Sequence, residues 1–151
     1  MRPVITAACL FIASAGAADA QGRPPLPAPA AAEAEKFFSL IKQGKAPEAF
    51  HDAFHDVEPQ MGSQTIDTAG AQTAAMLKTF GEIIDWSPYE TDTITPHMFR
   101  QTYFVRCSAI PMFVTIQFYE ADKGWHIVDI QLNTYTNGKN AGYYDAVQAA
   151  K

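Results

Sequence analysis

The chain has 151 residues, of which 48% are hydrophobic, and its formal net charge at pH 7 is −5. This length suffices for one domain with a hydrophobic core and is short for two. The acidic residues are spread along the chain and no basic stripe is present, which argues against a nucleic-acid partner or an anionic membrane surface.

Residues 1–20 are typical of a secretory signal peptide. Arg2 supplies a positive charge, an apolar run extends from Val4 to Ala18, and Ala18-Asp19-Ala20 fits the small-x-small pattern that a signal peptidase recognises. The run is shorter than the roughly 18 uncharged apolar residues that a membrane-spanning helix needs. We therefore expect cleavage after Ala20 and a periplasmic or secreted protein without a stable membrane anchor.

Cysteine usage changes once this leader is removed. Cys9 leaves with the leader and Cys107 remains alone, so no internal disulfide is expected. The segment Thr6-Ala7-Ala8 before Cys9 lacks the aliphatic residue of a lipobox, which favours a freely released protein over a lipoprotein.

The rest of the chain divides into a linker, one domain and a tail. Residues 21–32 (QGRPPLPAPAAA) predict an extended, Pro/Ala-rich linker. Residues 33–133 carry the periodic apolar patterns of a folded domain. Residues 134–151 are expected to form a tail that is partly ordered or contains a short helix.

Two helical regions open the predicted domain. Over residues 33–57 the apolar residues recur at helical spacing, with a kink expected at Gly44-Lys45 and an end at Glu58-Pro59. A second helix is expected over residues 68–80, with Asp67 or Thr68 as its N-cap and Gly81 in the left-handed C-terminal position.

From Ile83 onward the apolar period is two, which predicts strands at residues 83–84, 89–94, 98–107, 112–119 and 125–133. A three-residue loop with Gly124 in the left-handed conformation would close the last hairpin. It would pair Ala121 with Trp125 and, in the same register, Phe118 with Val128, Ile116 with Ile130 and Val114 with Leu132. These last six residues would share the core-facing side. Tyr119 and Ile127 would then lie on the opposite face.

The same parity argument applies to the preceding hairpin. A four-residue loop would pair Cys107 with Met112 and Val105 with Val114. The buried face of residues 98–107 would consist of Phe99, Gln101, Tyr103, Val105 and Cys107. These patterns predict an α+β fold, in which the N-terminal helices pack on one face of a curved antiparallel sheet.

Two segments carry a resemblance to a known superfamily. FFSLIKQGKAPEAFHDAF resembles the first helix of the nuclear transport factor 2-like (cystatin-like, cone-shaped) superfamily, with its Gly-Lys break and the Ala49-Phe50 pair after it. FYEADKGWHIVDIQL is similar to the last hairpin of that fold, where Gly124-Trp125 opens the final strand. The resemblance covers about residues 33–133 and is strongest for small exported bacterial domains without an assigned function. Its motifs are structural, so they point to a fold more than to an activity.

The resemblance implies a pocket inside the cone. Enzymes of this superfamily, such as ketosteroid isomerases and polyketide cyclases, place an acid or histidine base and a Tyr or Asp donor there. The candidates here are Gln101 and Tyr103, with Phe99 and Phe118 as apolar lining. Neither polar residue is a strong base, and a buried, hydrogen-bonded Gln or Tyr is the commoner case.

Two histidines and the remaining cysteine are the candidate reactive or metal-binding groups. His51 and His55 stand at i and i+4, the spacing that can hold a metal, yet no third ligand is identifiable and Asp52 replaces the Glu of the zinc-protease pattern. A solvated helix face is therefore expected, with no metal and no cofactor. Cys107 is expected to be a small buried hydrophobic residue.

The outer sheet face is expected to combine aromatic residues with arginine, a composition typical of interfaces. Its residues are Arg100, Phe104, Arg106, Phe113, Tyr119 and Asp129. Two interpretations stay open: a homodimer or protein partner at this face, or coverage by the tail with Tyr143, Tyr144 and Val147.

The sequence thus favours an exported, non-enzymatic domain that binds a small apolar ligand or a protein partner. One alternative is a small enzyme of the isomerase, cyclase or dehydratase type, with Tyr103 and an acid not yet placed. Another is an accessory subunit of an envelope complex, recognised through the sheet. An Asp or Glu beside Tyr103 would favour the enzyme, and a cone filled by side chains would favour the interaction protein.

Overall fold

A computed structural model describes residues 25–133, so the expected leader 1–20, the start of the linker and the tail 134–151 lie outside the described residues. Within this range four helices precede four strands. In chain order they are α1 (Ala28–Lys42), α2 (Ala46–Phe54), α3 (Glu58–Met61), α4 (Ser63–Phe80), β1 (Ile83–Thr95), β2 (Met98–Cys107), β3 (Met112–Ala121) and β4 (Gly124–Asn133).

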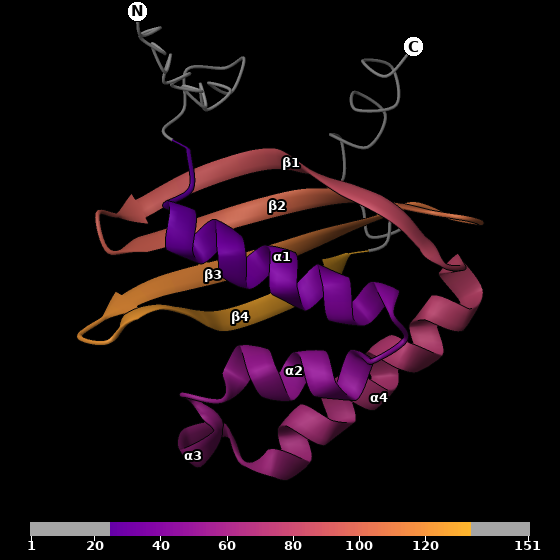
Figure 1. The fold of residues 1–151 in the computed structure, drawn as a ribbon, viewed down its shortest axis with the longest axis horizontal. Helices are drawn as coiled ribbons and strands as arrows, with labels where there is room; N and C mark the ends of the chain where they lie inside the picture. The colour runs from indigo at the N-terminus through magenta and orange to yellow at the C-terminus, as the bar shows by residue number, and fades with distance from the viewer. Residues whose placement is uncertain (1–24, 134–151) are drawn as a thin grey trace, which may run out of the picture.

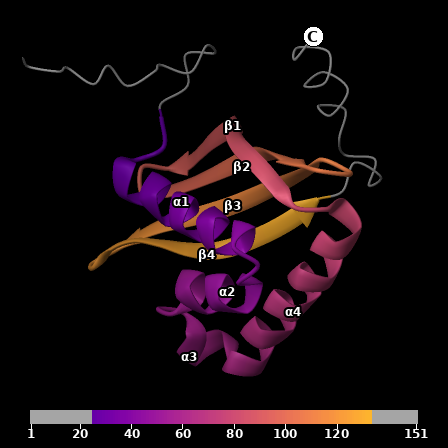
Figure 2. The same ribbon diagram turned by 45° about the vertical axis from the view of Figure 1, so that its right-hand side comes forward.

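The strands form one antiparallel sheet in the order β1-β2-β3-β4, and α1 crosses one of its faces (Figure 1). Helices α2 and α4 pack against each other beside β4, as the turned view also shows (Figure 2). This is the α+β arrangement that the sequence predicts. None of the helices in the described range combines the length and the apolar character needed to cross a membrane.

The first helical region divides into α1 and α2 at the expected place. Gly44 has a φ of 78°, a backbone conformation that favours glycine, and it turns the chain between the two helices. Helix α1 begins earlier than expected, so residues 28–32 are helical and not part of an extended linker. Pro29 in the first turn sacrifices no helical hydrogen bond, and Ala30 is fully buried.

The second helical region also starts earlier than the sequence suggests. Glu58-Pro59 opens the short helix α3 and does not end the helical region, and α4 begins at Ser63, after Gly62. Only Ile66 is buried among the first five residues of α4, which explains the weak apolar pattern there. A Cβ at Gly70 would lie 2.7 Å from the Cα of Pro47, so glycine permits the close approach of α4 to α2.

Strand β1 is continuous, where two separate runs were expected, and three register shifts interrupt its pairing with β2. As an edge strand it tolerates Pro88. Strands β2 and β3 pair two residues away from the expected register, with Val105 opposite Met112. The shift preserves parity, so the expected inner face of β2 is confirmed as buried.

The loop between β2 and β3 explains this shifted register. The backbone amide of Ser108 donates to the carbonyl of Glu82 at 2.9 Å. The amides of Ala109 and Ile110 donate to the carbonyl of Phe80 at 3.0 and 3.1 Å. Residues 108–110 are therefore held by the end of α4 instead of closing a tight hairpin.

The last hairpin departs from the expected pairing near its turn: the loop has two residues and not three, Ala121 lies opposite Gly124 and not Trp125, and Phe118 lies opposite Ile127 and not Val128. A turn at Asp122-Lys123 places Glu120 opposite Trp125, and a register shift at Val128 then restores the expected pairing of Ile116 with Ile130. Ile127 consequently pairs with Phe118 and is 2% exposed, whereas the sequence placed it on the outer face.

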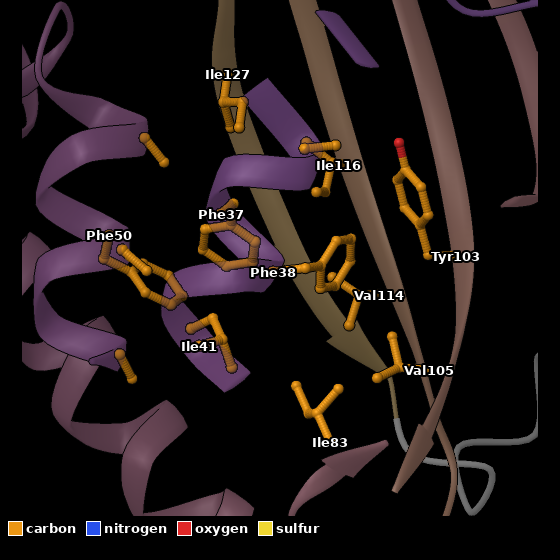
Figure 3. Close-up of a cluster of buried hydrophobic side chains, with 14 of the residues drawn as sticks. Phe37, Phe38, Ile41, Phe50, Ile83, Tyr103, Val105, Val114, Ile116 and Ile127 are labelled. Atoms are coloured by element: carbon orange, nitrogen blue, oxygen red, sulfur yellow. The ribbon is translucent and has the colours of Figure 1, made fainter. Parts of the chain in front are cut away.

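The core lies between α1 and the inner face of the sheet (Figure 3). Phe38 of α1 is central to it. Its ring stacks on Trp86 with a centroid distance of 5.2 Å and meets Tyr103 edge-on at 4.9 Å. Phe37 meets Phe50 at 5.4 Å and so connects α1 to α2.

Candidate ligand-binding sites

The residues expected to line a cone pocket lie on the inner face of β2 and β3, where they are part of the core. Phe99, Gln101, Tyr103 and Phe118 are each no more than 8% exposed. The Thr91 hydroxyl donates to Oε1 of Gln101 at 2.6 Å, and Nε2 of Gln101 donates to the carbonyl of Glu90 at 2.9 Å. The amide of Gln101 is thus satisfied by β1.

Aromatic packing occupies the space beside this amide. Phe99 packs against Trp125 at 5.3 Å, and the ring of Tyr103 is covered by Phe38, with its hydroxyl at the far end from the backbone (Figure 3). Burial, and to a smaller extent the charge of Glu35, raises the pKa of Tyr103 far above its ordinary value. The phenol therefore stays protonated at neutral pH, where it is a hydrogen-bond donor and not a base.

Glu35 is the acidic residue that the structure places near Tyr103, as the enzyme alternative would require. It stands on α1, is exposed, and accepts a hydrogen bond from the Trp86 indole N–H at 2.9 Å. Its carboxylate is near enough to influence Tyr103 but is solvated and already bonded. This environment lacks the apolar enclosure that makes a carboxyl group a general acid or base at neutral pH.

An open cavity of about 590 Å³ lies elsewhere, where the end of α1, the start of α2, the last turns of α4 and the start of β1 meet. We call it the junction cavity. Its lining residues are Ile41, Lys42, Gln43, Gly44, Ala46, Ala74, Leu77, Lys78, Gly81, Glu82 and Ile83.

Two turns and one loop hold the walls of the junction cavity in place. Gly44 turns the chain from α1 into α2, and Gly81, with a φ of 87°, ends α4. A Cβ at Gly81 would lie 2.1 Å from Oγ of Ser108, so a larger residue would displace the loop that binds the end of α4. The backbone amide of Glu82 donates to that same Oγ at 3.0 Å.

The walls of the junction cavity are apolar, and charged side chains lie at its rim. Ile41, Leu77 and Ile83 provide branched aliphatic surface. Lys42 donates to the carbonyl of Ile84 at 2.7 Å and lies 6.0 Å from the centre of the Trp86 ring, so its ammonium group is fixed at one side.

His51 of α2 and His55, the residue after α2, do not converge on one point. Nε2 of His51 lies 2.7 Å from Oδ1 of Asp67 on α4, and this hydrogen bond raises the pKa of His51. His55 lies 3.1 Å from Oδ1 of Asp56 instead. Among residues 25–133 no group of three or more His, Cys, Asp or Glu side chains is arranged to hold a metal ion.

A second, polar cavity of about 300 Å³ is lined by residues of α1, α2, the turn after α2 and the last hairpin. Asp56 lies between His55 and His126, with Nδ1 of His126 in contact with its second oxygen. Asp52 at the same cavity accepts a hydrogen bond from Nζ of Lys36 at 2.5 Å. The contacts of these groups join α2 and the turn after it to α1 and to β4.

Cys107 does not line this cavity. Its side chain is buried, and burial raises the pKa of its thiol.

The outer face of the sheet carries the residues expected there, but its arginines pair within the sheet. Arg100 bonds to Asp92 at 2.9 Å, and Arg106 bonds to Asp85. The carboxylate of Asp129 accepts a hydrogen bond from the Gln131 amide at 2.7 Å. Of the aromatic residues expected on this face, Tyr119 is 43% exposed, Phe104 is half-buried and Phe113 is buried.

Solved structures with the same arrangement of helices and sheet include a protein from Campylobacter jejuni, provisionally described as an NTF2-like (nuclear transport factor 2-like) transpeptidase. It aligns with 67% of this chain and 97% of its own, with a TM-score of 0.50 and 20% identity. The chain has the nuclear transport factor 2-like fold. At this identity the likeness concerns the fold alone.

A domain of unknown function with a cystatin-like fold, from Nostoc punctiforme PCC 73102, aligns with 78% of this chain and 82% of its own. Its TM-score is 0.47 and its identity 10%. No protein-family model matches the chain, and no curated protein matches it significantly.

Sequence reasoning missed the junction cavity because two stretches distant in the chain, residues 41–46 and 74–83, build it together. The signals that could have pointed to it are Gly44 and Gly81. The sequence predicts a helix break at Gly44 and a helix end at Gly81, and in the fold both turns line the same cavity.

Proposed function

We propose that the chain is an exported, non-enzymatic nuclear transport factor 2-like domain that binds a small apolar ligand in the junction cavity. The observation that carries this proposal is the contrast between two places in the fold. The inner face at Gln101 and Tyr103 is filled by side chains that satisfy one another, whereas the junction cavity offers about 590 Å³ beside apolar walls.

The size and lining of the junction cavity support a ligand of modest size. Pockets for small molecules span about 300–1,000 Å³, with mainly apolar walls and a few polar groups that set orientation. Lys42 and Lys78 lie at the rim together with Glu82, so the charged side chains of the lining carry a net positive charge. An apolar body with an acidic end group fits this arrangement, because the body meets the aliphatic wall and the acid meets lysine.

The enzymatic alternative has less support. Glu35 does stand near Tyr103, which is the placement that an acid–base enzyme would use. However, Phe38 packs on the phenol ring of Tyr103, and the indole N–H of Trp86 donates a hydrogen bond to the carboxylate of Glu35. A substrate would have to displace both aromatic contacts to reach these two groups.

The test uses the chain from Gln21 onward and cis-parinaric acid, a fluorescent fatty acid. Ala74 lines the junction cavity, so Ala74→Trp should fill it and weaken binding at least about tenfold, a loss of about 1.4 kcal/mol. Ala75, the next residue of α4, is exposed and not part of the lining, so Ala75→Trp is the matched control and should bind as the parent does.

Two outcomes would contradict the proposal. Equal binding by both variants would place the ligand elsewhere on the domain. If the parent chain bound none of a series of apolar acids of different length, the proposed function would be wrong.

A further inference from the structure

Three charged side chains lie at the rim of the junction cavity, and they differ in the contacts that they make within the fold. The cavity lies where α1 passes into α2 and α4 into β1 (Figure 1). Lys42 comes from the last turn of α1, Lys78 from the last turn of α4, and Glu82 from the short segment between α4 and β1. An acidic end group of a ligand therefore has two lysines within its reach.

Lys42 is held in place by β1. Its ammonium group donates to the carbonyl of Ile84 at 2.7 Å and lies 6.0 Å from the centre of the Trp86 ring. That ring is itself fixed, because its indole N–H donates to Glu35 at 2.9 Å. These contacts keep the ammonium group beside a backbone carbonyl oxygen, whose partial negative charge opposes the approach of a carboxylate. Lys42 therefore serves mainly to join α1 to β1.

Lys78 is placed differently. It follows Ala74 by one helical turn, so both residues lie on the face of α4 that lines the cavity. Side chains of a helix lean toward its N-terminus, so the stem of Lys78 extends over the turn that contains Ala74. Lys78 is exposed, and within residues 25–133 its ammonium group makes no hydrogen bond or ion pair. A ligand carboxylate at the mouth of the cavity can therefore pair with this charge.

The end of α4 does not depend on Lys78 to satisfy its carbonyl groups. Lysine is common near helix C-termini because its charge stabilises the last carbonyls. In α4 the carbonyl of Leu77 accepts from the amide of Gly81 at 2.8 Å, and that of Phe80 accepts from two amides of the β2–β3 loop. Since backbone amides already bind these carbonyls, a purely structural role explains Lys78 poorly.

We propose that Lys78 binds the acid end group of the ligand and so makes the junction cavity prefer a carboxylate over a neutral molecule of the same length. This inference rests on the proposed function. The apolar chain of the ligand lies along Ile41, Leu77 and Ile83, and its carboxylate lies at the α4 side of the mouth. Glu82 at the same rim is negatively charged and can only oppose such a ligand, so the preference depends on lysine.

The experiment compares the affinities for cis-parinaric acid and for its methyl ester at neutral pH, in the chain from Gln21 onward. The parent chain should bind the acid more tightly by about threefold or more, as expected for an ionic hydrogen bond open to solvent. Lys78→Met keeps an apolar stem and removes the charge, so it should abolish this preference and leave ester binding unchanged. Lys78→Arg restores the charge and should retain the preference.

Lys42→Met is the matched control, because it removes the other lysine of the rim. It also removes the bond to the Ile84 carbonyl, so it should unfold at a lower urea concentration than the parent while it keeps the preference for the acid. A Lys78→Met variant that still prefers the acid would overturn the proposal. A Lys42→Met variant that loses the preference would overturn it as well, because the acid would then bind at Lys42.

The same measurements separate this inference from the proposed function. Ala74→Trp should weaken binding of the acid and of the ester alike, because it fills the apolar part of the cavity. If it does so while Lys78→Met leaves the preference unchanged, the cavity binds apolar ligands and only the role of Lys78 is wrong. If the parent chain binds neither the acid nor the ester, the proposed function and the role of Lys78 are both wrong.

Discussion

Gln101 is a polar side chain enclosed in the core, and its contacts explain why it is there. Its amide accepts from Thr91 and donates to the carbonyl of Glu90, so it fastens edge strand β1 to β2 next to the register shift between Pro88 and Glu90. The sequence correctly placed Gln101 on the inner face by parity. It could not show which β1 residue is the partner, because the register shifts between β1 and β2 decide that Thr91 lies opposite Gln101.

Replacing Gln101 by alanine should therefore destabilise the domain. Gln101→Ala leaves the Thr91 hydroxyl without its acceptor and the Glu90 carbonyl without this donor, at a cost of about 1–3 kcal/mol. Gln117→Ala on the half-buried outer side of β3 is the control and should cost less. Urea unfolding measures both, and equal costs would mean that the Gln101 amide is not essential to the sheet.

We expect the packing of α2 against α4 to depend on pH through His51. Its hydrogen bond to Asp67 raises its pKa above the ordinary value of 6.5. A pKa raised by folding adds stability that is fully present below 6.5 and is lost as the pH rises through the raised value. Asp67→Asn should thus lower the melting temperature more at pH about 5.5 than at pH about 8.5. An equal decrease at both pH values would show that the pair does not act through charge.

For the helices and strands, the periodic apolar patterns predicted which side of each element is buried better than they predicted which residues pair between strands. Apolar residues at helical spacing identified the buried sides of α1 and α2, and alternation identified the inner face of β2. Parity survives a shift of two residues, so the β2–β3 faces were right although the pairing was displaced. The displacement arises from hydrogen bonds between residues 108–110 and the end of α4, which no local pattern reveals.

The β3–β4 hairpin shows the opposite case, in which a shift of one residue changes the face. Ile127 and Val128 are adjacent apolar residues, so either could face the core, and the register shift at Val128 selects Ile127. Ile127→Ala should cost about 2–5 kcal/mol, as expected for a buried large-to-small change, and Val128→Ala less, because Val128 is half-buried. The reverse order in denaturant unfolding would restore the register expected from the sequence alone.

For the whole molecule, the predicted export and the proposed ligand binding are independent of each other. Export is predicted from residues 1–20, so mass spectrometry of the protein from its native host should find Gln21, or its cyclised form, at the N-terminus. An intact Met1 in the cytosolic fraction would contradict export without affecting the fold or the junction cavity.

The candidate site was less predictable than the fold. The resemblance of residues 37–54 and 118–132 to a cone-shaped superfamily directed attention to the inside of the cone, which Phe38 and Trp86 help to fill. The junction cavity depends on the relative placement of α1, α2, α4 and β1. That placement follows from tertiary packing, such as the contact of Gly70 with Pro47, and not from any single segment.

Amide and methyl NMR during a titration with cis-parinaric acid would show where on the domain the ligand binds. We expect the signals of Ile41, Leu77 and Ile83 to shift together as the junction cavity fills, while those of Gln101 and Phe118 do not. Saturable shifts centred on Gln101 and Phe118 would contradict it, because they would place the ligand inside the cone.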